Sequence, residues 1–158
     1  MAALIQRVVL PQATLATLTG GQAFYVGSGA PPLVVGAAVV PPKILDLSQY
    51  TSIVAFASLS AALVTATQVL INLQGIIPEI PVPVAGLPVQ AAATGGVVAV
   101  FNNMATTAAI TSQSTVQLIT GTTRFLRAAI SVQFNATPAG GGDMYLWFYG
   151  LGDAPREI

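Results

Sequence analysis

The sequence predicts an all-β protein, folded as a single antiparallel β-sandwich with an extended N-terminal arm and a proline-rich loop. Strand-forming Val, Ile, Thr and aromatic residues are plentiful, whereas Glu and Lys, which usually cover exposed helix faces, are nearly missing. Fifteen Gly and eleven Pro cut the chain into short pieces, as in sandwiches and barrels. Several of these pieces alternate apolar and polar residues, which is the period of a half-buried strand.

Residues 1–42 are predicted to form an extended arm with a few short strands, and residues 43–158 the sandwich domain. "LIQRVV" alternates, "TGGQAFYVGSGAPP" is rich in turn residues, and "LVVGAAVV" lies between Pro31-Pro32 and Pro41-Pro42. Prolines at both ends confine that last piece to an edge strand or an extended lasso. An ordinary first strand with its loops is an equally good interpretation of this segment.

Residues 43–75 are predicted to form two strands. The second carries apolar and threonine side chains on one face, namely Thr65, Thr67, Val69, Ile71 and Leu73. A helical stripe through Leu59, Leu63 and Leu70 is the alternative, but no cap or charged outer face accompanies it. Ile53–Leu73 is also long enough to span a bilayer as a helix. Its polar residues and the lack of flanking basic clusters argue against a membrane span.

The proline-rich loop follows, as "GIIPEIPVPVAGLPVQAAATGG". Pro78, Pro81, Pro83 and Pro88 exclude a helix or a central strand over this span. Its apolar Ile and Val favour a long structural loop buried against a neighbour over a motif for a proline-binding groove. "VVAVFN", "TAAITS" and "TVQLITG" are then predicted to be short strands.

A hairpin is predicted near the C-terminus. In "RFLRAAISVQFN", residues 124–135, one face is apolar and consists of Leu126, Ala128, Ile130, Val132 and Phe134. Arg127, Ser131 and Gln133 lie on the other face. "ATPAGGGD" is predicted to make the turn, and "DMYLWFYGL", residues 143–151, to return beside the first strand.

The returning strand is apolar on both faces, so we expect both to be covered. Met144, Leu146 and Phe148 are assigned to the core. The candidate interface comprises Tyr145, Trp147 and Tyr149 with Phe125 and Arg127 of the partner strand. Three uses of this face remain open: cover by a loop of the same chain, a subunit or shell contact, or a platform for sugar stacking. Tyr and Trp are enriched at interfaces.

The composition contains few of the residue types that act as catalytic groups or metal ligands. With no His and no Cys, the usual general base, thiol nucleophile and soft metal ligands are missing. The carboxylates are scattered, although folding could join Asp46 to Glu79, and Asp143 could hold calcium with loop carbonyls. We therefore predict no enzyme, no cofactor and no metal site. Arg124 and Arg127 do not make a basic patch, so no nucleic-acid partner is expected.

Charged residues make up 6% of the chain and the formal net charge is zero, where about 25% charged residues is usual. Such a surface favours association, so neighbouring subunits are expected to cover much of it. The N-terminus lacks the pattern of a signal peptide, which indicates synthesis in a cytoplasm. Asn135-Ala136-Thr137 matches a glycosylation motif, and we interpret the match as accidental.

"LDLSQYTSIVAFASLS", "TRFLRAAISVQF" and "MYLWFYGLG" together resemble tailed-bacteriophage virion proteins built as jelly-roll or related β-sandwiches, over residues 43–151. The resemblance implies a capsid decoration or cement protein on the outer capsid surface, commonly a trimer. Its partners would then be copies of itself and the major capsid protein, and heat stability would be expected. The alternatives are a carbohydrate-binding module of a phage tail or baseplate, or a filament subunit that donates a strand.

Overall fold

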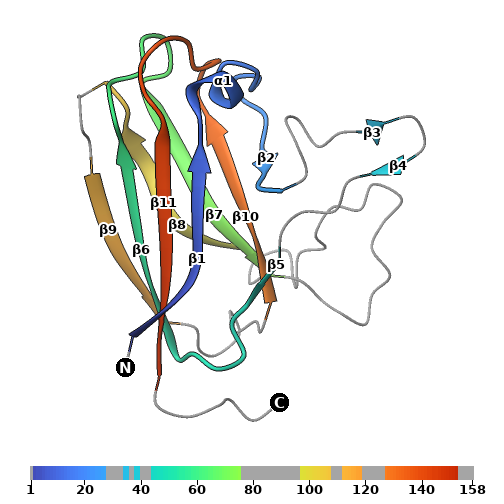
Figure 1. Ribbon diagram of the computed structural model, residues 1–158, viewed down its shortest axis with the longest axis vertical. Helices are drawn as coiled ribbons and strands as arrows, with labels where there is room; N and C mark the ends of the chain where they lie inside the picture. Colours follow the sequence, from blue (N-terminus) through green and yellow to red (C-terminus); the bar gives the residue numbers. More distant parts are fainter. Residues whose placement is uncertain are drawn as a thin grey trace.

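The computed structural model describes residues 2–27, 34–35, 38–39, 44–75, 97–107, 112–118 and 127–152. Two antiparallel sheets pack face to face (Figure 1). Sheet A consists, in spatial order, of β1 (Ala2–Leu10), β11 (Met144–Leu151), β6 (Ser52–Leu59) and β9 (Ser112–Leu118). Sheet B consists of β2 (Phe24–Tyr25), β10 (Arg127–Phe134), β7 (Gln68–Gly75) and β8 (Val97–Ala105), with β5 (Ile44–Asp46) also on β10. The predicted all-β sandwich is confirmed.

β2 and β5 are two halves of one strand, because they pair with the same edge of β10. Val26, directly after β2, donates its N–H to the carbonyl oxygen of Ile130 at 3.0 Å. Ile44, the first residue of β5, pairs with Ala129. These register positions are consecutive along β10. β2 and β5 therefore occupy neighbouring positions on one edge of β10, although residues 27–43 separate Val26 from Ile44 in the sequence.

Counted in this way, the described residues contribute eight strands to the sandwich, and the order of these strands is that of a jelly roll. Sheet A contains the first, eighth, third and sixth strands, and sheet B the second, seventh, fourth and fifth. All pairings are antiparallel. Two interlocked Greek keys produce this order.

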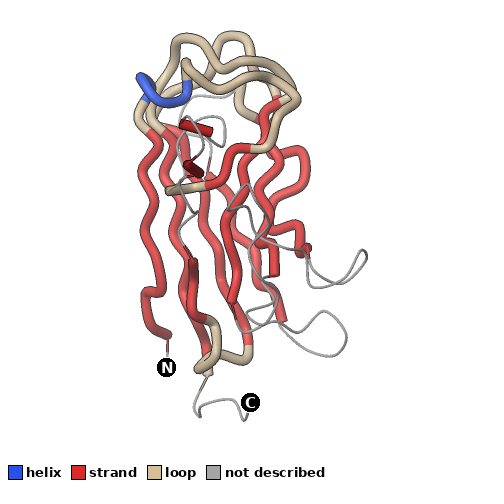
Figure 2. The backbone as a smooth tube through the Cα atoms, turned by 90° about the vertical axis from the view of Figure 1, so that its right-hand side faces the viewer, coloured by secondary structure: helices blue, strands red, loops and turns tan. Residues whose placement is uncertain are grey.

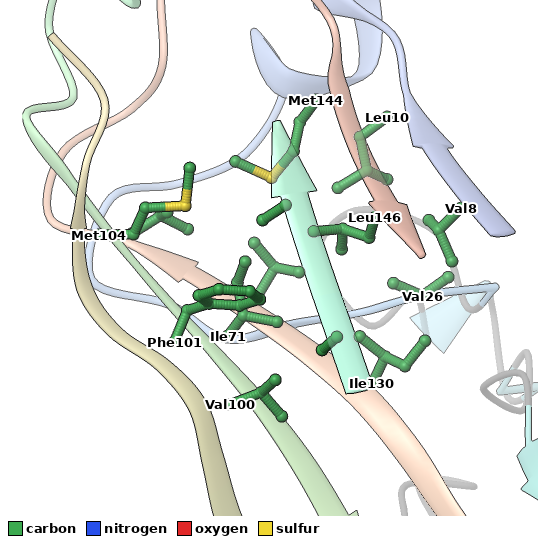
Figure 3. Packing of buried hydrophobic residues seen from close by; sticks show 14 of the residues in the cluster. Val8, Leu10, Val26, Ile71, Val100, Phe101, Met104, Ile130, Met144 and Leu146 are labelled. Atoms are coloured by element: carbon green, nitrogen blue, oxygen red, sulfur yellow. The ribbon is translucent and has the colours of Figure 1, made fainter. Parts of the chain in front are cut away.

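The hydrophobic core lies between the two sheets (Figure 3). Alternation along β11 turns Met144, Leu146 and Phe148 inward, each with no exposed surface, as predicted. Facing them from β10 and β7 are further fully buried side chains, among them Ile130 and Ile71. Burying a side chain of this size contributes about 1.5–3 kcal/mol, so this alternation is what fixes the register of the strands.

The predicted hairpin between β10 and β11 is wrong. β10 pairs with β2, β5 and β7, whereas β11 pairs with β1 and β6. Residues 135–143 cross from sheet B to sheet A. Each strand has a strongly apolar face, and packing these faces across the roughly 10 Å between two sheets buries both. Pairing the strands edge to edge would have placed both faces on one side of one sheet.

Strands were correctly predicted within residues 44–75, although three are found, β5, β6 and β7, rather than two. Val69, Ile71 and Leu73 of β7 are all buried. The helical stripe is wrong, since α1 (Gln12–Leu15) is the only helix within the described ranges. In that part of the chain no helix is long and apolar enough to cross a membrane.

Residues 2–10, expected within an extended arm, form β1, an ordinary edge strand of sheet A along β11. The alternative interpretation of a first strand therefore describes this part of the segment. A short hairpin follows later, in which β3 (Val34–Val35) pairs with β4 (Ala38–Val39) as a separate two-stranded sheet. Most of the proline-rich loop, including its four prolines, lies outside the described residues.

α1 and several loops gather at one end of the sandwich (Figure 2). The carboxylate of Asp143 accepts a hydrogen bond from the backbone N–H of Gln12 at 2.9 Å, which supplies the cap that Pro11 does not provide. This contact ties the start of α1 to the beginning of β11.

Candidate functional site

The outer side of sheet A carries a cluster of apolar and aromatic side chains. We call it the aromatic face and define it by Leu4 and Val9 of β1, Phe56 of β6, and Tyr145, Trp147 and Tyr149 of β11. The strand registers bring them together, because Trp147 pairs with Phe56, Val9 with Tyr145, and Leu4 with Tyr149. Cross-strand neighbours on one face of a sheet are in contact range.

The rings of this face are ordered by their neighbours. Tyr145 and Trp147 lie nearly parallel, with centroids 5.8 Å apart and an interplanar angle of 15°. Phe56 and Tyr149 meet edge to face at 5.9 Å and 87°. Both arrangements are favourable for aromatic pairs. The face is therefore a preformed surface on a rigid sheet.

The aromatic face is partly exposed in the described part of the chain, whereas β11 was expected to be covered on both sides. Leu4 is 52% exposed, and Val9 and Phe56 are 40% exposed. Tyr145, Trp147 and Tyr149 are each partly exposed. Cover by a loop of the same chain stays a prediction, because the proline-rich loop and the other long loops that could supply it lie outside the described residues. Exposed apolar area of this kind typically marks a contact site.

Charge on and around this face is sparse. Arg7 of β1 pairs with Trp147 and is exposed, so a cationic side chain projects from the sheet next to the central aromatic residue. At the end of the face near α1, Asp143 accepts a hydrogen bond from the hydroxyl of Tyr145 at 3.4 Å. The surface can thus offer one cation and two tyrosine hydroxyls to a partner, in an otherwise apolar setting.

Of the predicted interface residues, Tyr145, Trp147 and Tyr149 lie together as expected. Assigning Arg127 to this face is wrong, because β10 belongs to sheet B and Arg127 is exposed on that other sheet. The error follows from the wrong hairpin. Phe125 lies outside the described residues. Gln133, considered as a partner for a sugar, also lies on β10 and donates to the carbonyl oxygen of Gly21 at 2.9 Å.

Sequence reasoning missed Leu4, Arg7, Val9 and Phe56. Their alternation in "LIQRVV" and "TSIVAFASL" was a usable signal for strands. What the alternation could not reveal is which strands flank β11, because that depends on the order of strands in the sheet. Arg7 takes the place on the aromatic face that Arg127 was expected to fill.

Asp46 and Arg127 face each other in sheet B, where β5 pairs with β10. The backbone N–H of Ser48 donates to the Asp46 carboxylate at 3.0 Å. This bond, a second from the Ser48 side chain and then the charge of Arg127 lower the pKa of Asp46 below its ordinary value, while slight burial opposes them. The carboxylate of Asp46 is exposed, and a pair of opposite charges on a surface contributes little to stability.

The other sites considered, for a metal ion, for a pair of carboxylates and for a ligand in a groove, offer few functional groups among the described residues. No group of three or more acidic residues that could hold a metal ion occurs among the described residues. Glu79, the suggested partner of Asp46, lies outside them. A shallow groove of about 160 Å³ on sheet B has no charged lining residue; it is lined by Gly21, Gln68, Val69, Leu70, Gln133, Phe134 and Asn135.

Asn135, from the glycosylation match, is used by the fold. Its Oδ1 accepts the backbone N–H groups of Thr67 and Gln68, both at 3.0 Å. Its Nδ2 donates to the hydroxyl of Thr67 at 2.7 Å. The amide thus clamps the end of β10 to the start of β7, and a glycan on Nδ2 would disrupt this clamp. This supports the interpretation of the motif as accidental.

No protein-family model matches the chain, and no curated protein matches it. The candidate site therefore rests on the jelly-roll topology and on the composition and exposure of the aromatic face.

Proposed function

We propose that the protein is a non-enzymatic structural protein of a phage virion, a decoration or cement protein that stabilises the capsid through contacts with copies of itself and with the shell. The observation that carries the proposal is the partly exposed aromatic face on the outer side of sheet A, opposite the face that packs on the core. Binding of a partner over this face is favourable, because it removes apolar area from water and gains about 25 cal/mol per Å².

The fold supports this proposal by analogy, since viral capsid domains are among the proteins that use jelly rolls. Fold alone does not establish function. The low charge content points the same way, because a neutral surface with 6% charged residues favours association. The trimer that the resemblance implies remains a prediction.

The first experiment is the solution mass of the purified chain, by size exclusion with light scattering. A mass that is a multiple of 16.1 kDa is expected, and Trp147→Ser should reduce it to that of one chain. Leu70→Ser, on the outer side of sheet B, is the matched control and should leave the mass unchanged. Phe56→Ser is the second variant if Trp147→Ser loses its folded circular dichroism spectrum.

The cement role is tested on particles. Quantitative mass spectrometry of purified virions should find the chain in a fixed ratio to the shell protein. Particles stripped of it should release DNA at a lower temperature, and adding the chain back should restore that temperature. Particles that contain no copies of the chain would contradict the proposed function, whatever its solution mass.

A carbohydrate-binding module is the second candidate, favoured by the nearly parallel rings of Tyr145 and Trp147 beside the exposed Arg7. A sugar ring can stack on such rings, and a guanidinium can bind its hydroxyl or carboxylate groups. Trp147 is the only tryptophan, so a sugar-dependent change in tryptophan fluorescence of a monomeric protein would favour this candidate. For a strand-donating filament we find no such observation in the described residues, where each sheet contains four strands when β2 and β5 are counted as one.

A further inference from the structure

We propose that the free edge of β1 is the contact between copies of the chain. A second copy adds its own β1 to this edge, in the antiparallel direction, so that sheet A continues from one copy into the other. The contact rests on the self-association in the proposed function and supplies its geometry.

β1 is an edge strand of sheet A. Among the described residues it pairs with β11 alone, and no backbone hydrogen bond outside this ladder involves residues 3–9 there. Edge strands usually avoid pairing with other chains by means of prolines, lysines or bulges. β1 contains no proline and no lysine, and its bulge lies between Leu4 and Gln6. The C-terminal half of β1 therefore remains a regular strand edge.

The free backbone groups of this edge follow from the ladder on the far side of β11. Residues of a central antiparallel strand direct their N–H and C=O groups alternately to the two neighbouring strands. The C=O of Asp143 accepts the N–H of Ser60 at 3.0 Å, on the β6 side. The even-numbered residues of β11 therefore bond to β1. Their register partners on β1 are Leu10, Val8 and Gln6.

The N–H and C=O groups of Arg7 and Val9 thus point away from β11. The side-chain amide of Gln6 donates to the C=O of Arg7, which agrees with a carbonyl outside the ladder. Both side chains are exposed, Val9 to 40%, so this edge can be reached from the outer side of sheet A. A strand added here would bond to these backbone groups and cover the side chain of Val9.

A second copy of β1 fits this edge in one register. With a two-fold axis at Val8, Arg7 of each copy lies opposite Val9 of the other, and the free backbone groups of both residues are paired. An axis at Arg7 would place two like charges opposite each other, which is destabilising. An axis at Val9 would place Arg7 opposite Pro11, which has no N–H to donate. Axes nearer the N-terminus run into the bulge.

This pairing would join the aromatic faces of the two copies. One row across the combined sheet then contains Trp147 and Arg7 of one copy, followed by Val9 and Tyr145 of the other. Neighbours in such a row are in contact range, so Arg7 would have an apolar side chain on each side. Trp147→Ser removes one of these two, which agrees with the loss of self-association expected of that variant.

The contact uses the same strand of both copies, so it is isologous. Isologous contacts are closed by a two-fold axis, and every assembly built on this one contains an even number of chains. It therefore differs from the trimer that the resemblance implies. A wild-type solution mass of three chains, or of one, would overturn the edge pairing.

The first test changes the charge opposite Arg7. Val9→Lys would place like charges opposite each other at two points of the pair, and Val9→Glu would place opposite charges there. Both variants lose the same valine, so each is the control for the other. Their dissociation constants should differ by about tenfold, since two cross-strand charge pairs change sign. Sedimentation over a dilution series measures this difference.

Equal dissociation constants for the two variants would overturn the pairing, because a contact made through the aromatic face alone would be weakened by both. Arg7→Glu combined with Val9→Lys restores opposite charges across the pair and should associate more tightly than Val9→Lys alone. This double variant also keeps the test decisive if Val9→Lys loses its folded circular dichroism spectrum.

The second test is a disulfide between copies, which is clean because the chain has no cysteine. Opposite residues of a hydrogen-bonded antiparallel pair have Cα atoms about 5.5 Å apart, within the range that a disulfide spans. Arg7→Cys mixed with Val9→Cys should therefore give a linked pair under mild oxidation. Arg7→Cys mixed with Leu70→Cys, on sheet B, should not.

Neither Arg7→Cys nor Val9→Cys should link to itself, because each cysteine would face the unchanged residue of the other copy. Linkage within either variant alone would indicate a different axis and overturn the proposed register. A mixture that gives no linked pair would overturn the contact itself.

These outcomes separate the edge contact from the proposed function. A wild-type monomer that still binds virions refutes the edge contact and leaves the shell contact in place. A chain that is absent from virions refutes the proposed function, even where the disulfide confirms the pairing of β1 with β1.

Discussion

At the scale of single residues, the crossing loop between β10 and β11 depends on glycine at a position of close approach. Gly141 has φ +78°, a conformation that side chains with a Cβ rarely adopt. A Cβ there would lie 2.2 Å from the carbonyl oxygen of Ala62. The loop therefore packs directly on the backbone that follows β6, which a larger residue would prevent.

Gly141→Ala should lower the free energy of unfolding by more than the roughly 1–2 kcal/mol that a left-handed residue costs by itself. Gly21→Ala is the matched control. It has the same φ of 78°, but nothing lies within 4 Å of its added Cβ. Urea unfolding of both variants separates backbone strain from the steric clash, and equal losses would show that the clash with Ala62 is relieved without cost.

Asp46 gives a prediction about pH. Because folding lowers the pKa of its carboxyl below the ordinary 3.8, the charged group contributes stability above that value. This contribution is lost as the pH falls through the folded-state pKa. The difference in unfolding free energy between wild type and Asp46→Asn should thus be constant from neutral pH to about pH 5 and shrink below it. Since Asp46 is exposed the effect is small, and a difference that does not vary with pH would contradict it.

At the scale of elements, the alternating side chains of β11 have two different roles: those on one face pack in the core, and those on the other face are available for contact with a partner. Its inward residues fill the core, and its outward residues make up half of the aromatic face. A strand at the centre of a sheet, paired on both sides by β1 and β6, is a rigid place for such a surface. Preformed aromatic surfaces lose little conformational entropy on binding.

Phe148→Ala should cost about 3–5 kcal/mol of unfolding free energy, because Phe148 is fully buried and its loss leaves a cavity. Tyr149→Ala, one position along the same strand, should cost much less, since it gives up an edge-to-face contact with Phe56 worth about 0.5–1.5 kcal/mol. Denaturant unfolding at one protein concentration measures both. Similar losses would show that the outward face is part of the folding core.

The candidate site could be predicted only in part at this scale. The alternation of "DMYLWFYG" correctly separated Tyr145, Trp147 and Tyr149 from the core residues between them. It also led to Arg127 as a neighbour, since strands joined by a short glycine-rich loop usually pair. Residues 135–143 cross between the sheets instead, and this choice depends on the packing of two apolar faces. No local pattern records that packing.

At the scale of the whole molecule, the protein combines a complete sandwich with surfaces that are poor in charge. The aromatic face, with Leu4 52% exposed and Val9 and Phe56 each 40% exposed, would be stabilised by a contact with a partner. The solution mass is thus the measurement that decides whether this partner is a second copy of the chain.

The sequence by itself determined the class of the fold and the inward and outward sides of its main strands. Composition and two-residue alternation are local properties, and strands follow from them. Only the tertiary structure decided that β10 and β11 lie in different sheets, that Arg7 rather than Arg127 lies beside Trp147, and that β2 and β5 share one edge of β10. These facts depend on which strand edges pair. The pairing is selected by the free energy of burying two apolar faces against each other. Residues far apart in the chain contribute to this free energy together, so no local pattern reveals it.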